Sequence, residues 1–201
     1  MPYITREDIE SNFRSLTELQ KVELSARAKA PTISQRQYDR RIQFIFLSHS
    51  HKDADLVRKA VYYLLSQNIH VYVDWMDDSM PNRTSAETAS KIRQKIDECD
   101  QFSVLATNNS RDSKWVPWEL GYADGKKTDR NIVIYPVADN NGHWEGAEYF
   151  GLYRHISLGR VIAHQNKSSR VMVHPAEKPL GVPFDDYLRS PTIYANGSLL
   201  F

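Results

Sequence analysis

Several residue types are scarce in this 201-residue chain, and each scarcity excludes a class of protein. Cys99 is the single cysteine, so the chain can form neither an internal disulfide framework nor a cysteine-rich metal site. The 26 basic residues balance 25 acidic ones, which argues against a dedicated nucleic-acid binder. No apolar run approaches the ~20 residues that a membrane span requires. We therefore expect a soluble, cytoplasmic protein that binds neither nucleic acid nor a membrane.

Glycine is scarce in a way that bears on nucleotide binding. The chain has 8 glycines, and Gly121 is the first of them. The dinucleotide fingerprint and the P-loop both place glycines directly after an early strand, because the backbone must approach a phosphate there. Neither motif can occur in the first half of this chain, so any nucleotide that it handles is bound without a glycine-rich loop.

Strand and helix signals alternate over the middle of the chain. Short apolar runs bounded by polar turns are typical of buried strands, and apolar residues three and four apart are typical of helices. The strand signals lie at residues 42–47, 69–75, 102–107 and 132–137. The helical signals between them lie at residues 53–67, 84–99 and 115–126. This alternation predicts an α/β fold with a doubly wound, mainly parallel sheet.

Local signals predict the ends of these elements. Residues 6–29 have the spacing of one amphipathic helix, which either packs on the main domain, forms a dimer contact or binds a partner. Thr84 and Glu87 have the spacing of a capping box and predict the start of the third helix. Residues 108–114 predict a loop.

The two ends of the chain are expected to be extensions of one domain. Two apolar segments, at 160–164 and 170–174, predict a late hairpin. We assign residues 1–39 to an N-terminal helical extension, residues 40–160 to the main domain, and residues 161–201 to a C-terminal extension packed on it.

Polar residues gather where the predicted strands end. In an open α/β sheet, ligands bind beyond the carboxyl ends of the strands. The segments at that edge begin at Ser48, Asp74 and Asn108, and the helix that carries Trp115 and Glu119 opens onto the same edge. These two residues are four apart and share a helix face, and an ionised Glu119 is expected near the positive helix end. An aromatic ring beside a fixed carboxylate suits a sugar that carries a cationic ring; the alternative is a glutamate that only complements the helix dipole.

Two further groupings of polar residues indicate other chemistries only weakly. His49, His51 and Asp53 are residue types that bind metals. Their spacing on a loop defines neither a complete set of ligands nor a coordination geometry, and we expect no metal. The acidic residues at 74, 77 and 78 follow the second strand, whereas a receiver-type phosphoacceptor pocket needs acids after the first.

Three sequence blocks resemble those of Toll/interleukin-receptor (TIR) domains. FIFLSHSHKDAD is similar to their first-strand box, and VYVDWMDDSMP to their second strand and its loop. ATNNSRDSKWVPWELGYADGKK is similar to their third-strand and helix region, with the core Ser113, Trp115, Glu119 and Leu120. The resemblance covers residues 40–160, and with the IVIYPV and EYFGLY segments it extends to stand-alone prokaryotic TIR proteins, including those of Thoeris antiphage systems.

The resemblance implies a flavodoxin-like fold and, as in catalytic members, cleavage of the nicotinamide–ribose bond of NAD+. It implies that Glu119 is catalytic. The resemblance also implies substrate-binding residues in the loop after the first strand, in the loop after the second strand that covers the site, and at the start of the helix that carries Glu119. They are Ser48, His49, Asp74, Trp75, Asp77 and Trp115. One departure lies in the covering loop, where many members have Pro-Gly and this chain has Pro81-Asn82. The product is expected to be ADP-ribose or a cyclic or derivatised form of it.

The same resemblance implies the partners. NAD+ is the substrate and no cofactor is expected; self-association through TIR–TIR contacts is expected, as is a separate effector that senses the product. One carboxylate suffices for this reaction, because nicotinamide is already cationic and leaves neutral, without a general acid. Two alternatives stay open: a non-enzymatic assembly module, and a nucleoside-processing enzyme such as a deoxyribosyltransferase.

Overall fold

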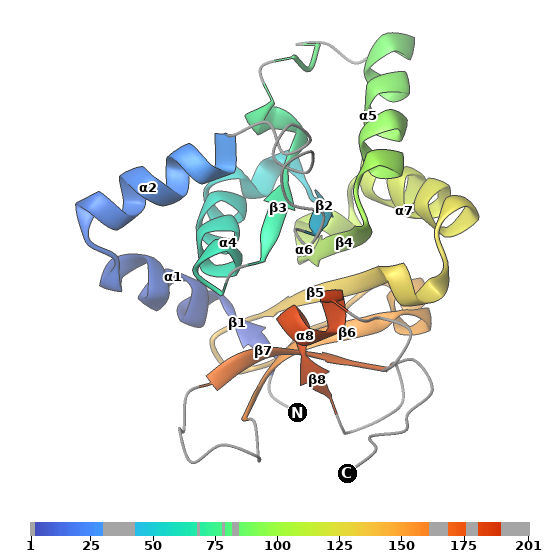
Figure 1. Ribbon diagram of the computed structural model, residues 1–201. Helices are drawn as coiled ribbons and strands as arrows, with labels where there is room; N and C mark the ends of the chain where they lie inside the picture. Colours follow the sequence, from blue (N-terminus) through green and yellow to red (C-terminus); the bar gives the residue numbers. More distant parts are fainter. Residues whose placement is uncertain are drawn as a thin grey trace.

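The protein is built on one mixed sheet whose central strands are parallel (Figure 1). The computed structural model describes residues 3–29, 43–67, 69–77, 79–81, 85–160, 169–175 and 181–189. The strand order is β3-β2-β4-β5-β6-β7-β8, and β1 pairs with β5 beside this path. The strands are β1 (Ile4–Thr5), β2 (Phe44–Ser48), β3 (His70–Tyr72), β4 (Gln101–Ala106), β5 (Ile132–Ala138), β6 (Arg154–Arg160), β7 (Ser169–His174) and β8 (Val182–Pro183). The pairs from β3 to β6 are parallel, and β7 and β8 are antiparallel additions. The predicted doubly wound, flavodoxin-like α/β fold is confirmed.

Helices cover both faces of the sheet. Figure 1 shows α1 (Arg6–Ser15), α2 (Glu18–Lys29) and α4 (Ala54–Ser66) on one side, and α5 (Ala86–Glu98) and α7 (Trp115–Lys126) on the other. Alternate residues of β2 point to the two faces: Ile45 and Leu47 join the core beneath α4, and Phe44 and Phe46 join the core beneath α5 and α7. A strand buried on both faces has the continuous apolar sequence seen there.

The N-terminal region forms two helices, so the prediction of one helix over residues 6–29 is wrong. Leu16 has an extended backbone that ends α1. Thr17 then accepts a hydrogen bond from the Gln20 amide, and the Gln20 side chain accepts one from the Thr17 amide. This reciprocal pair is a capping box that starts α2. Both helices pack against α4, and β1 joins the first of them to β5.

Three other boundaries differ from the predicted ones. The helix predicted from Thr84 begins at Ala86, because Ser85 caps it by accepting from the Thr88 amide. The predicted loop after β4 contains the short helix α6 (Asn108–Arg111). The second strand stops at Tyr72 rather than Trp75, because the chain turns into the 3-10 helix η2 (Asp74–Met76). That turn brings Asp74 and Trp75 to the carboxyl edge of the sheet.

A late hairpin is present, but its first strand is Arg154–Arg160 and not the predicted segment 160–164. β6 and β7 pair antiparallel from His155 with His174 to Arg160 with Ser169. Residues 161–168, which include most of the predicted first strand, lie outside the described residues, as do Asp78 and Asn82. Cys99 is buried in the core beneath α5 and α7. No helix within the described ranges is long and apolar enough to cross a membrane.

Candidate functional site

The order of the strands defines where the site lies. The chain runs from β2 to β3 on one side and then returns to place β4 on the other side of β2. In a doubly wound sheet, this reversal opens a crevice at the carboxyl ends of the two central strands, where ligands bind. Ser48 ends β2 at this point and lies in register with Val104 of β4. α4 leaves toward one face and α7 covers the other, so Ser48 lies at the reversal.

Glu119 reaches this crevice from α7. The helix packs against both β2 and β4, and the Ser48 hydroxyl donates a hydrogen bond of 2.5 Å to Oε2 of Glu119. Only 5% of Glu119 and 1% of Ser48 are exposed. The structure therefore brings together the predicted catalytic carboxylate and a predicted substrate-binding residue that are 71 positions apart in the chain.

The ionised state predicted for Glu119 is wrong for the free protein. Burial raises its pKa to about 8; the Ser48 hydrogen bond opposes this rise, and the nearby charge of Asp74 adds to it. Glu119 is the fifth residue of α7, and the favourable effect of a helix N-terminus is confined to the first turn. The loss of water around the carboxylate therefore outweighs the dipole, and the free protein holds a mostly neutral carboxyl at pH 7.

His49 follows Ser48 and is also buried. Its Nδ1 lies 3.0 Å from the carbonyl oxygen of Leu47, and its Nε2 lies 3.7 Å from Oδ1 of Asp74. Burial lowers the pKa of His49 below 6.5, although the charge of Asp74 acts in the opposite direction. Because Asp74 also influences Glu119, the three ionisable groups form one electrostatic cluster.

Trp75 lies at the outer side of this cluster. Its ring is 6.4 Å from the His49 ring in an edge-on arrangement, and 39% of the residue is exposed. Its backbone amide donates to Oδ1 of Asp74, which fixes that carboxylate within η2. The predicted substrate-binding residues at 48, 49, 74 and 75 therefore gather around Glu119 or its neighbours.

Asp77 and Trp115 have other contacts. The Asp77 carboxylate accepts hydrogen bonds from the Tyr72 hydroxyl and the Ser79 amide. The Trp115 ring packs edge-on against Trp118 at 5.3 Å. Their assignment to substrate binding stays a prediction.

A buried network ties the two loops of the crevice together. The Asp53 carboxylate accepts hydrogen bonds from the Thr107 hydroxyl at 2.6 Å and from the Asn109 side-chain amide at 2.7 Å. The chain positions are more than 50 residues apart, and no local spacing signals the pairing. The sequence analysis grouped Asp53 with the metal-ligand types and did not predict this role. The structure shows no side-chain capping bond from it.

No metal centre is assembled from these side chains. Within the part of the chain that the structure describes, no three or more histidine, cysteine, aspartate or glutamate residues are grouped to hold a metal ion. Asp53 faces Thr107 and Asn109 instead of the two neighbouring histidines.

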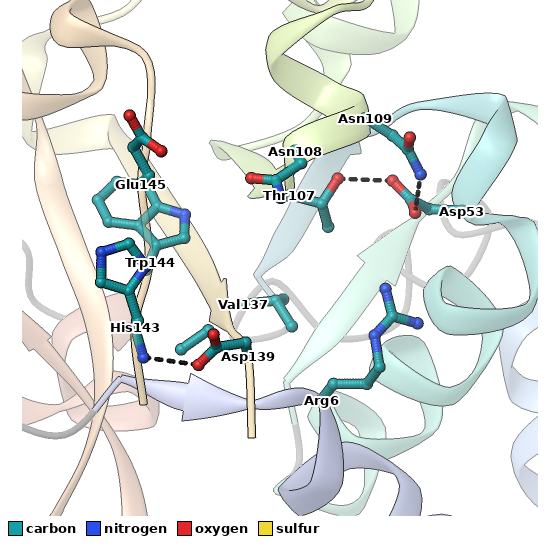
Figure 2. Close-up of a pocket in the computed structure, with 11 residues that line it drawn as sticks. Arg6, Asp53, Thr107, Asn108, Asn109, Val137, Asp139, His143, Trp144 and Glu145 are labelled. Carbon is teal, nitrogen blue, oxygen red and sulfur yellow. Dashed lines mark hydrogen bonds between the residues drawn. The ribbon is translucent and has the colours of Figure 1, made fainter. Parts of the chain in front are cut away.

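A separate cavity of about 380 Å³ opens at the carboxyl ends of β4 and β5 (Figure 2). The Asp53–Thr107–Asn109 network forms one of its walls, and Arg6 points into it from the start of α1. Trp144 forms the facing wall, held by a hydrogen bond from its ring nitrogen to the Ala106 carbonyl. Neither Ser48 nor Glu119 lines this cavity. The buried, perturbed carboxylate therefore identifies the candidate active site better than the open volume does.

Comparison with known proteins agrees with this geometry. The TIR domain family matches residues 45–164, and the chain belongs to that family. It is 34% identical over 148 residues to a Bacillus cereus (strain MSX-D12) protein named "Probable 3' cyclic ADP-D-ribose synthase ThsB'", which covers 71% of this chain and 75% of the relative. It is 28% identical over 88 residues to a Cytobacillus dafuensis protein named "Putative cyclic ADP-D-ribose synthase TIR2", covering 42% of this chain and 23% of that protein.

Proposed function

We propose that this protein is an NAD+-consuming enzyme that breaks the nicotinamide–ribose bond and joins the ADP-ribose unit into a cyclic product. The observation that carries this proposal is the buried Glu119 carboxyl, held by Ser48 at the reversal of strand order. The names of the two relatives supply the cyclic ADP-D-ribose product.

Glu119 acts as the electrostatic partner of the reacting sugar. NAD+ brings a cationic nicotinamide ring, and positive charge spreads onto the ribose as that ring leaves. A nearby positive charge favours the ionised form of a carboxyl group, so substrate binding lowers the pKa of Glu119 from its free value of about 8. The resulting carboxylate stabilises the oxocarbenium-like centre in a site with little water. Ser48 holds Oε2 in place throughout.

A cyclic product fits the dryness of the cluster. Ser48, His49 and Glu119 are each less than a tenth exposed. Water competes poorly for a reacting carbon in such a site, whereas a hydroxyl of the substrate itself is brought in with it. Intramolecular capture is therefore favoured over hydrolysis.

The remaining elements of the proposal are what we expect of a member of this family. NAD+ is the substrate, and no metal or separate cofactor takes part. Self-association through TIR–TIR contacts supports activity, and an effector protein senses the cyclic product. We place the protein in the cytoplasm, in antiphage defence of the Thoeris type.

The test is incubation of the purified full chain with NAD+, with chromatography and mass spectrometry of nicotinamide and nucleotide products. We expect nicotinamide release with a cyclic product, and loss of both in Glu119→Gln. Glu148→Gln, which changes an exposed glutamate, is the matched control and is expected to keep wild-type turnover. Equal turnover in Glu119→Gln and the wild type would refute the assignment.

A non-enzymatic assembly role is the second candidate, and an aromatic row on α7 favours it. Trp118 is 37% exposed and stacks on Tyr122, with the Arg93 guanidinium 5.7 Å from the Trp118 ring. Such a surface suits contact with another protein domain. Concentration-dependent association without any loss of NAD+ would favour this candidate over the enzyme.

A further inference from the structure

Two hydrogen-bond acceptors, on His49 and Asp74, lie near Glu119, and no donor among the described residues lies between them. Nδ1 of His49 lies 3.0 Å from the Leu47 carbonyl oxygen, so Nδ1 carries the ring hydrogen and donates it there. Nε2 therefore presents a lone pair. It is buried, has no hydrogen-bond partner among the described residues, and lies 3.7 Å from Oδ1 of Asp74, beyond hydrogen-bonding distance.

This arrangement calls for a donor from a bound ligand. A buried acceptor without a donor is unfavourable, and two acceptors near each other are more so. Oδ1 of Asp74 already accepts from the Trp75 amide, whereas Nε2 of His49 is unused. An O–H group placed at Nε2 would satisfy the lone pair and lie close to the Asp74 carboxylate.

We propose that His49 is the general base of the cyclisation: its Nε2 takes the proton from the substrate hydroxyl that attacks the ribose carbon. This inference rests on the proposed function. The C–N bond to nicotinamide breaks, and nicotinamide leaves neutral with the electron pair of that bond. The hydroxyl oxygen forms the new C–O bond, and its proton moves to Nε2. The imidazolium then releases the proton to solvent when the product leaves.

Asp74 is the positioning residue for this base. Its carboxylate, 3.7 Å from Nε2, stabilises the imidazolium that forms, while the Leu47 carbonyl holds the ring in the required tautomer. The ionisable groups that act on His49 come from two elements. Asp74 of η2 and Asp53 of η1 (His51–Asp53) raise its pKa, and His51 lowers it. Burial has the largest effect and holds the pKa below 6.5, so the imidazole is an unprotonated base at pH 7.

The same lone pair could instead accept from the carboxamide N–H of nicotinamide. In that case His49 would contribute to binding alone, and its loss would raise KM and slow cleavage without changing what the cleaved sugar becomes. The ratio of cyclic to linear product separates the two roles, because water captures the ribose without a base and a sugar hydroxyl is helped by one.

The experiment measures nicotinamide release and the cyclic-to-linear product ratio from pH 5 to 9 in the wild type and in His49→Gln, Asp74→Asn and His70→Gln. Glutamine keeps an acceptor oxygen but cannot take up a proton at these pH values. We expect the cyclic-to-linear ratio in His49→Gln to fall at least tenfold, which is a larger decrease than that of nicotinamide release. In the wild type this ratio decreases at acidic pH as His49 is protonated, and we expect this acidic limb to be absent in His49→Gln. Because Asp74 raises the pKa of His49, the limb in Asp74→Asn moves to lower pH. His70→Gln, which changes a histidine at the amino end of β3, leaves the ratio and its limb as in the wild type.

Three results overturn the inference. One is a wild-type product ratio in His49→Gln with a raised KM, which assigns the residue to binding. Another is an acidic limb that does not move in Asp74→Asn, a result that remains informative if His49→Gln fails to fold. The third is the absence of nicotinamide release from the wild type, which removes the proposed function as well, whereas the first two leave it standing.

Discussion

Removal of one hydroxyl group tests the electrostatic role of Glu119. Ser48→Ala keeps the backbone and the β-carbon, and deletes only the O–H that donates to Oε2 of Glu119 at 2.5 Å. Both side chains are buried, so water is poorly placed to substitute for the lost donor. The variant therefore isolates the contribution of this hydrogen bond.

The magnitude follows from the state of Glu119. A pKa of about 8 means that only about a tenth of the free protein carries the carboxylate at pH 7. A hydrogen bond to a charged group is worth ~1.5–3 kcal/mol, and the Ser48 bond favours the ionised form. Its loss is expected to reduce kcat/KM at pH 7 by ~10- to 100-fold and to move the pH midpoint up by ~1 to 2 pH units.

The assay is nicotinamide release as a function of pH. Because kcat/KM reports ionisation in the free enzyme, the wild-type profile is expected to rise with pH to a midpoint near 8. Ser50→Ala is the matched control, since it removes from the same loop a buried hydroxyl that accepts a hydrogen bond from the Lys52 amide. A midpoint in Ser48→Ala equal to that of Ser50→Ala would show that the Ser48 hydrogen bond does not control the ionisation of Glu119.

Three further predictions concern stability and metal dependence. The raised pKa of Glu119 favours the neutral form in the folded state, so its contribution to stability is present below pH 4.5 and is lost as pH rises through about 8. The free energy of unfolding is therefore expected to fall less between acidic pH and pH 9 in Glu119→Gln than in the wild type, by at most ~5 kcal/mol. Urea titrations measure this difference, and an equal fall in the two proteins would contradict the assigned pKa. Asp53→Ala leaves Thr107 and Asn109 without their acceptor and is expected to cost about 2–4 kcal/mol in the same titrations. A cost near zero would show that the network adds nothing. Chelation with EDTA is expected to leave nicotinamide release unchanged, and a loss restored by one added metal ion would require a metal site.

Elements with strong local signals were predicted well. The helix over Trp115–Lys126 has the predicted ends, and β2 and β5 lie where the apolar runs are longest. The break between α1 and α2 also had a local signal, the Thr17 and Gln20 capping pair, which continuous apolar spacing obscured. β1 had none, because a strand of two residues exists only through its pairing with β5.

The site could be predicted as a place more readily than as a set of contacts. The rule that ligands bind at the carboxyl ends of parallel strands, together with the TIR resemblance, was enough to select Ser48 and Glu119. Sequence spacing contains no information on the tie from Asp53 to Thr107 and Asn109, because it depends on how two loops from different strands meet.

The charge state of Glu119 shows why position and chemistry are predicted with different success. From the sequence, the carboxylate lies near a positive helix end, and this local field favours ionisation. In the fold, α7 covers β2 and β4, which removes the water that an ionised group needs. Burial is a property of the assembled domain, and here its effect exceeds that of the local field. A neutral glutamate that ionises only when a cation enters the site would act selectively on a substrate with a cationic ring, so the desolvation that sequence reasoning missed is what suits Glu119 to its proposed reaction.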